Sequence, residues 1–82
     1  MNGIEQKIIL FLLENCKQPN ISSEKISSCQ DLYAHSLLDS LLNLRLLNFL
    51  EKEFSIQIPP FQVIRKNFLT VDSITKLVKS LQ

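Results

Sequence analysis

The stretch LLDSLLNLRLLNFLEKEF, from Leu37 to Phe54, decides the fold. It contains no Gly or Pro and is dense in strong helix formers, so it predicts a helix over Leu41 to Phe54 with Asp39 or Ser40 as the N-cap. Its apolar residues are more numerous than a single core-facing stripe requires. We expect some of them to face outward or toward a guest, although a helix at the centre of a bundle would show the same pattern.

Helical spacing of apolar residues recurs at both ends of the chain. A first amphipathic helix is predicted from Ile4 to about Cys16, with Ile8, Phe11 and Leu12 at helical spacing. Thr70 is a plausible N-cap for a last helix. The residues expected to share one face of that helix are Val71, Ile74, Leu77, Val78 and Leu81.

Two segments between these helices are less regular. Residues 17–36 contain Pro19 and many serines, whose side chains compete with helical hydrogen bonds, so they predict a long loop. Apolar side chains that could hold this loop to the core are Ile21, Ile26, Leu32 and Tyr33. Pro59-Pro60 ends any preceding helix, and residues 61–68 predict one short helical turn with Phe61, Ile64 and Phe68 pointing inward.

The chain of 82 residues has room for one core, so residues 1–82 are expected to form a single domain. One Gly and three Pro leave few sharp turns, which favours helices over sandwiches or barrels. We therefore predict an all-α fold, a four-helix bundle with three longer helices and one short one.

Composition argues against several functions. The formal charge is +1 with scattered basic residues, Trp is absent and Tyr33 is the only tyrosine, so neither a basic face nor a stacking surface for nucleic acid is expected. No stretch approaches the roughly 20 apolar residues of a membrane span. Glu5 and Glu14 flank the apolar run of residues 8–13 where a signal peptide would avoid acids. We expect a cytoplasmic monomer in which Cys16 and Cys29 are free thiols, without a metal site.

The polar pair Asp39-Ser40 stands among four leucines at the start of the central helix. A serine there directs its hydroxyl outward, and the unpaired N–H groups of a helix start favour an anionic group attached to it. Ser40 is thus well placed to carry a phosphodiester.

Three blocks of sequence together resemble the acyl and peptidyl carrier protein family. Asp39-Ser40-Leu41 is followed by Leu50-Glu51-Lys52-Glu53-Phe54 and Ile56-Gln57-Ile58-Pro59, at the family's spacing, and the segment 67–74 is similar to the Phe-x-Thr-Val block that opens the family's last helix. The resemblance covers residues 31–81 well. It covers residues 1–30 only through the pattern of one helix and a long loop.

The resemblance implies a bundle of acyl-carrier type with 4'-phosphopantetheine attached covalently to Ser40 and no catalysis by the chain itself. A phosphopantetheinyl transferase would attach the arm. An adenylate-forming ligase or acyltransferase would load it with an acyl or aminoacyl thioester, and downstream synthases or transferases would use the cargo.

The chain departs from fatty-acid carriers, whose second helix is strongly acidic. Asn43, Arg45 and Asn48 lie in that helix here, so the chain better resembles carriers of specialised pathways such as nonribosomal peptide or polyketide synthesis. Ser36 occupies the place where relatives often carry Gly, which suggests a tighter or differently angled loop. The expected partner-binding residues are Asp39, Leu41, Leu42, Leu44 and Arg45, each leucine being equally compatible with the core.

Three other interpretations remain. The chain could be a housekeeping fatty-acid carrier, or a helical adaptor of the same fold that lacks the prosthetic group. A hydrolytic triad of Ser40, His35 and Asp31 or Asp39 is poorly supported, because the nucleophile-elbow motif is absent and a small bundle offers little depth for an oxyanion hole.

Overall fold

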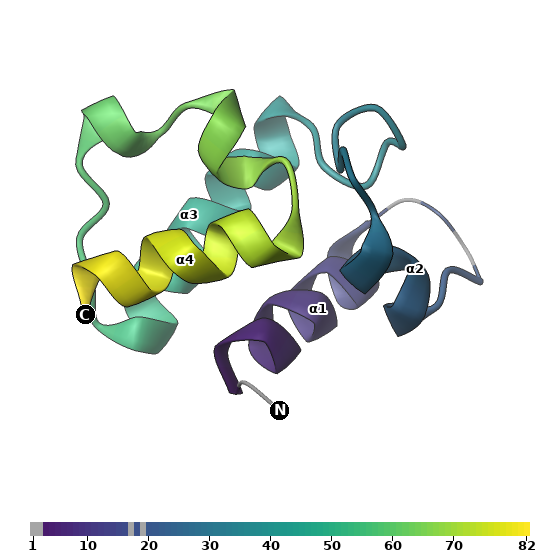
Figure 1. Ribbon diagram of the computed structural model, residues 1–82, viewed down its shortest axis with the longest axis horizontal. Coiled ribbons are helices and arrows are strands. Elements are labelled where there is room, and N and C mark those ends of the chain that lie inside the picture. The colour runs from purple at the N-terminus through teal and green to yellow at the C-terminus, as the bar shows by residue number, and fades with distance from the viewer. Residues whose placement is uncertain (1–2, 17, 19) are drawn as a thin grey trace.

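The computed structural model describes residues 3–16, 18 and 20–82. In these residues the chain forms four α-helices and two 3-10 turns (Figure 1): α1 (Gly3–Asn15), α2 (Ser23–Ser28), α3 (Ser40–Phe54), η1 (Pro60–Gln62), η2 (Arg65–Phe68) and α4 (Val71–Leu81). Three helices are long and α2 is short, and no strand occurs in the described part of the chain. The predicted all-α class is confirmed, and the arrangement is compatible with a small helical bundle.

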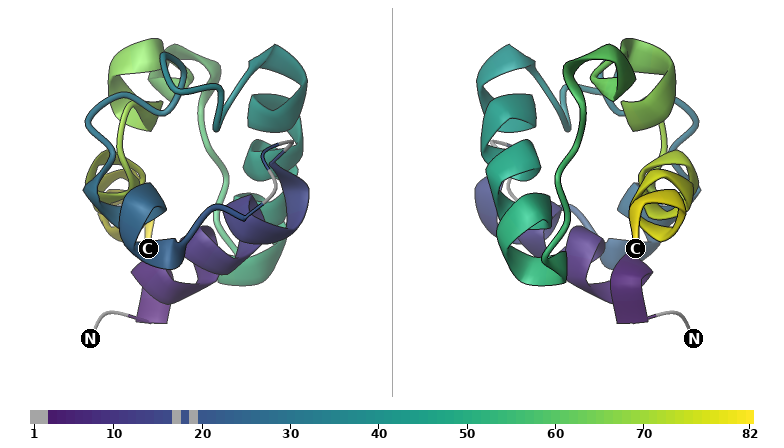
Figure 2. Two further views of the ribbon diagram at one scale, coloured as in Figure 1. Left: turned by 90° about the vertical axis from the view of Figure 1, so that its right-hand side faces the viewer. Right: turned by 90° about the vertical axis from the view of Figure 1, so that its left-hand side faces the viewer.

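Helices α3 and α4 lie on opposite sides of the molecule, and α1 crosses below them (Figure 2). Helix α4 packs on α1, α2 and η2. Helix α3 meets α1 through aromatic side chains, because the rings of Phe11 and Phe49 stack with their centroids 4.7 Å apart. Phe54 adds an edge-on contact to Phe49 at 6.4 Å. The molecule measures 32 × 27 × 19 Å.

Helix α3 buries one stripe and exposes other apolar residues. Leu42, Leu46 and Leu50, four positions apart, lie in the core. Leu41 and Leu44 are 58% and 57% exposed. The prediction that some leucines of this helix face outward is therefore confirmed.

Both ends of the chain form the predicted helices. Helix α1 buries Ile8, Ile9 and Leu12. Helix α4 begins after Thr70, whose side chain accepts a hydrogen bond from the Ser73 N–H at 2.9 Å. The predicted apolar face of α4 is buried or half-buried along its whole length.

The prediction of an uninterrupted loop over residues 17–36 is wrong, because α2 lies within it. The serines do not simply oppose helix formation here: the Ser22 hydroxyl caps α2 by accepting from the Lys25 N–H at 3.2 Å. Ile26 is fully buried and holds this short helix on the core. Lys17 and Pro19, also part of the expected loop, lie outside the described residues.

The prediction of one inward-facing turn over residues 61–68 is also wrong. The segment forms two separate 3-10 turns, because Val63 leaves the helical conformation with φ −84° and ψ 71°. Of the three residues expected inside, only Phe68 is buried, whereas Phe61 is 75% and Ile64 46% exposed. The short helix of the chain is therefore α2 and not this segment.

No helix of the described residues has the length and apolar character needed to cross a bilayer.

Candidate functional site

Ser40 is the first residue of α3 and its side chain is exposed. The chain reaches it through Leu37 and Leu38, which are both buried, and returns to the core at Leu42. Apolar residues on both sides thus hold the backbone against the core while the Asp39-Ser40-Leu41 segment faces solvent. This is the placement that the sequence predicts for Ser40.

Asp39 is the N-cap of α3. Its backbone is extended, and its carboxylate accepts a hydrogen bond from the Leu42 N–H at 2.8 Å. Its carbonyl oxygen accepts from the Asn43 N–H at 2.7 Å. Of the two N-caps allowed by the sequence, the structure selects Asp39, so the Ser40 hydroxyl is not used for capping.

The segment before Ser40 is anchored on Leu32. The Leu32 carbonyl accepts from the N–H groups of Leu37 and Leu38, and its own N–H donates to the Leu69 carbonyl at 2.8 Å. Ser36 lies between these anchors with φ 59°, in the left-handed region. Ser36 therefore adopts a backbone conformation that favours Gly.

The structure brings together four of the five expected partner-binding residues. A small hollow of about 40 Å³ is lined in part by Asp39, Leu41, Leu42 and Arg45. Leu42 differs from the expectation, because it is only 8% exposed and belongs to the hydrophobic core. The residues that remain available for contact are Asp39, Leu41, Leu44 and Arg45.

A larger groove of about 440 Å³ is lined in part by Ser40; we call it the Ser40 groove. Besides Ser40, its polar lining residues are Tyr33, Asn43 and Arg65, and its apolar lining residues are Leu44, Leu47, Val63 and Ile64. The carbonyl oxygen of the Asn43 side chain is buried and has no hydrogen-bond partner in the structure. The groove therefore combines the Ser40 hydroxyl with apolar walls.

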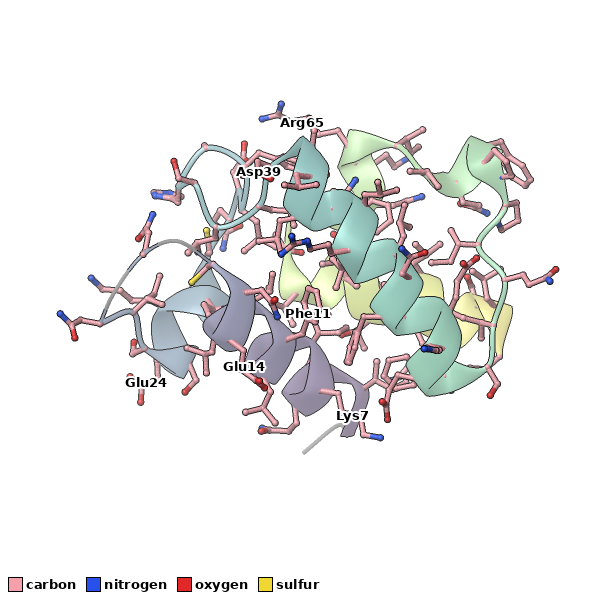
Figure 3. All side chains as sticks on the ribbon, turned by 180° about the vertical axis from the view of Figure 1, so that it is seen from behind. Lys7, Phe11, Glu14, Glu24, Asp39 and Arg65 are labelled. Atoms are coloured by element: carbon pink, nitrogen blue, oxygen red, sulfur yellow. The ribbon has the colours of Figure 1, made fainter. Side chains whose placement is uncertain are left out.

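Charges of both signs lie at the Tyr33 end of this groove. The Arg65 guanidinium lies over the Tyr33 ring, 4.8 Å from the centroid, and its Nη2 is 3.7 Å from Asp31 Oδ2. Burial raises the pKa of the Tyr33 phenol above its usual value of 10.0, while Arg65 lowers that pKa and Asp31 raises it. Figure 3 shows Arg65 and Asp39 at the same edge of the molecule.

Arg65, Tyr33 and Asn43 were not among the site residues expected from sequence. No local motif marks them, because Tyr33 and Arg65 lie far apart in the chain and come together only when the 60–68 segment folds across the start of α3.

The geometry does not favour the hydrolytic triad. His35 lines a different groove, with Lys25 and Cys29, from the one that Ser40 lines. Asp39 is engaged as the α3 cap. Within the described residues, no hydrogen bond joins the side chains of Ser40 and His35.

The same part of the chain holds no group of three His, Cys, Asp or Glu side chains able to bind a metal ion. Cys16 and Cys29 are not joined by a disulfide, and both are half-buried. A hollow of about 880 Å³ lies between the end of α3 and residues 56–60, and none of the expected site residues lines it.

No protein-family model matches the chain, and searches of curated proteins and of solved structures find no match either.

Proposed function

We propose that the chain is a carrier protein that holds acyl or aminoacyl groups as thioesters on a 4'-phosphopantetheine arm attached to Ser40. The observation that carries this proposal is the position of Ser40: it is exposed, free of the capping role and fixed between buried leucines at the start of α3. These features make the hydroxyl accessible to a modifying enzyme and hold it in a defined place. The resemblance of residues 31–81 to carrier proteins supports the same proposal.

The residues around Ser40 fit such an arm. The Ser40 groove offers the apolar walls formed by Leu44, Leu47, Val63 and Ile64 to an aliphatic chain. At one end, Arg65 offers a cation to a phosphodiester. When bound, the arm supplies a thiol on which the cargo is carried as a thioester.

Attachment is a phosphoryl-group transfer in which Ser40 Oγ is the nucleophile. A new bond forms between Oγ and the pantetheine-bearing phosphorus of coenzyme A, the phosphoanhydride bond breaks, and adenosine bisphosphate leaves with its electron pair. The hydroxyl proton passes to a base of the transferase. In this step the carrier contributes the nucleophilic hydroxyl and its position at the start of α3.

The surface next to Ser40 favours specialised-pathway partners over those of a housekeeping fatty-acid carrier. Leu41 and Leu44 are exposed and Arg45 lies beside them, and the first turn of α3 has no acidic residue. A contact surface of this kind suits an apolar face on a ligase, acyltransferase or synthase better than a basic one. We place the partner contact at Asp39, Leu41, Leu44 and Arg45.

Intact-mass measurement tests the proposal. The purified chain is incubated with coenzyme A and a broad-specificity phosphopantetheinyl transferase, and the wild type is compared with Ser40→Ala and Ser23→Ala. Ser23 is a matched control because it is also the exposed first residue of a helix. Wild type and Ser23→Ala are expected to gain the mass of one phosphopantetheine, and Ser40→Ala is expected to gain none.

The contrary result is an unmodified wild type under conditions that fully modify an established carrier. This result would contradict the proposed carrier function and favour a helical adaptor without a prosthetic group.

A further inference from the structure

A separate groove lies between α1 and α3; we call it the α1–α3 groove. It has a volume of about 380 Å³. Its apolar lining residues are Leu10, Phe11 and Phe49, and its charged lining residues are Lys7, Glu14 and Glu53. None of these residues lines the Ser40 groove.

The apolar part of the α1–α3 groove is only partly covered. The stacked rings of Phe11 and Phe49 are half-buried, and Leu10 is 53% exposed. A single exposed leucine is ordinary on a protein surface. The charges around Leu10 therefore decide what this face of the molecule can contact.

Lys7 and Glu14 lie on either side of Leu10 along the exposed face of α1. Seven residues correspond to two helical turns, so the two charged residues lie on one face, about 10 Å apart along the helix axis. Their midpoint falls between Leu10 and Phe11. In Figure 3, Lys7 and Glu14 are labelled along α1, with Phe11 toward α3.

Glu14 lies in an unfavourable place within the single chain. It belongs to the last turn of α1, which contains no basic residue, and a carboxylate at the C-terminal end of a helix opposes the helix dipole. None of the ion pairs among the described residues involves Glu14. A cation supplied from outside the chain would therefore stabilise it.

The order of charges on α1 is self-complementary. When two copies of α1 lie antiparallel, related by a two-fold axis between Leu10 and Phe11, Lys7 of each copy faces Glu14 of the other. A two-fold interface requires this reciprocity of contacts. The existing pair of Lys7 with Glu53 is exposed and so contributes little, which leaves Lys7 available to a second carboxylate.

We propose that the α1–α3 groove is the interface of a weak homodimer, in which Lys7 of each chain pairs with Glu14 of the other and the two Leu10 side chains cover each other. The inference does not rest on the carrier function, since Ser40 does not line this groove. It replaces the monomer expected from the sequence. One leucine and one ion pair per chain place the interface in the small, transient class.

Sedimentation equilibrium of the full chain tests the proposal, at protein concentrations up to about 1 mM. The wild type is expected to dimerise reversibly, and added salt is expected to weaken the dimer. Lys7→Glu and Glu14→Lys are each expected to weaken it by at least about tenfold, because each change turns both intermolecular ion pairs into like-charge contacts. Circular dichroism verifies that each variant keeps its helices.

Glu24→Lys is the matched control for Glu14→Lys. It makes the same change of charge at an exposed residue of α2 that does not line the groove, and it is expected to dimerise as the wild type does.

A mixture of the two weakened variants tests the antiparallel pairing itself. When a Lys7→Glu chain faces a Glu14→Lys chain, both intermolecular pairs again join opposite charges. An equimolar mixture is therefore expected to dimerise at least as tightly as the wild type, although neither variant does so alone.

A wild type that stays monomeric up to about 1 mM would overturn the inference and leave the groove to a different protein partner. Dimers that Lys7→Glu and Glu14→Lys form as tightly as the wild type would also overturn it, because another surface would then hold the two chains together. So would a mixture of these two variants that fails to associate.

Discussion

The guanidinium carbon of Arg65 lies 4.8 Å from the centroid of the Tyr33 ring, in cation–π distance. The contact joins the loop that leads to Ser40 with the 60–68 segment that faces it across the groove. It also provides a spectroscopic reporter of the site, because Tyr33 is the only tyrosine and the chain has no tryptophan.

Alkaline titration of the Tyr33 absorbance is expected to give a pKa above 10.0 in the folded protein, because burial disfavours the phenolate. Arg65→Gln is expected to raise this pKa further, since the guanidinium lowers it. With a raised folded-state pKa, the stabilising contribution of Tyr33 is complete below the unfolded-state pKa and is lost as the pH rises through the folded-state value. Lys66→Gln serves as the control, and a lower pKa in Arg65→Gln would contradict the described geometry.

Glycine at the left-handed positions is expected to stabilise the fold. Ser36 and Ser55 have φ values of 59° and 52°, where a side chain is strained and Gly is not. We expect Ser36→Gly and Ser55→Gly each to raise the free energy of unfolding by about 0.5–1 kcal/mol in urea denaturation. Ser27→Gly, which replaces a residue within α2, is expected to lower it instead. Equal destabilisation by all three changes would refute the assigned backbone conformations.

Removing the α3 cap is expected to weaken the helix that presents Ser40. Asp39→Ala loses the hydrogen bond to the Leu42 N–H and should lower the free energy of unfolding by about 1 kcal/mol. Asp39→Asn keeps a good capping oxygen and should be nearly neutral. Chemical denaturation measures both variants. If they prove equally destabilised, the charge of Asp39 and not its capping hydrogen bond is what matters.

Substitution of Leu42 is expected to lower stability, whereas substitution of Leu44 is expected to weaken recognition by the transferase. Leu42→Ala should cost about 2–5 kcal/mol in unfolding free energy, because the side chain is buried in the core. Leu44→Ala should change stability by less than about 0.5 kcal/mol. It should lower kcat/KM for phosphopantetheinyl transfer by about fivefold, which corresponds to the loss of a contact that contributes about 1 kcal/mol to the interface. Unchanged transfer to Leu44→Ala and Leu41→Ala would remove these leucines from the proposed contact surface.

Glu51 and Glu53 are expected to differ in their contribution to stability despite lying in the same Leu50–Phe54 block. The half-buried Glu51 carboxylate accepts from the Ile58 N–H at 2.9 Å and ties the 56–59 segment to α3. Glu51→Ala should therefore cost about 1.5–3 kcal/mol in unfolding free energy. Glu53 forms an exposed pair with Lys7 at 2.6 Å, and Glu53→Ala should cost less than about 1 kcal/mol. Thermal or urea unfolding of both variants measures which substitution lowers the free energy of unfolding more.

The sequence was most informative where a single physical rule applied. The three long helices follow from apolar periodicity, and the cap at Thr70 follows from a side chain that accepts a hydrogen bond from the first turn. For α3 the sequence allowed Asp39 or Ser40 as the cap, and the structure has Asp39. The errors arose where two rules competed. The serines of residues 22–28 oppose a helix interior but favour a helix start, and only the burial of Ile26 decides between these effects.

By itself the sequence determined the helical class, the position of Ser40 at the start of α3 and the exposure of some leucines, because these depend on local spacing and capping. Only the tertiary structure decided that Leu42 is core while Leu41 and Leu44 are surface, since that depends on which neighbours cover α3. It also decided that Tyr33, Asn43 and Arg65 share a groove with Ser40. That groove forms by packing between segments distant in the chain, and no local pattern encodes such contacts.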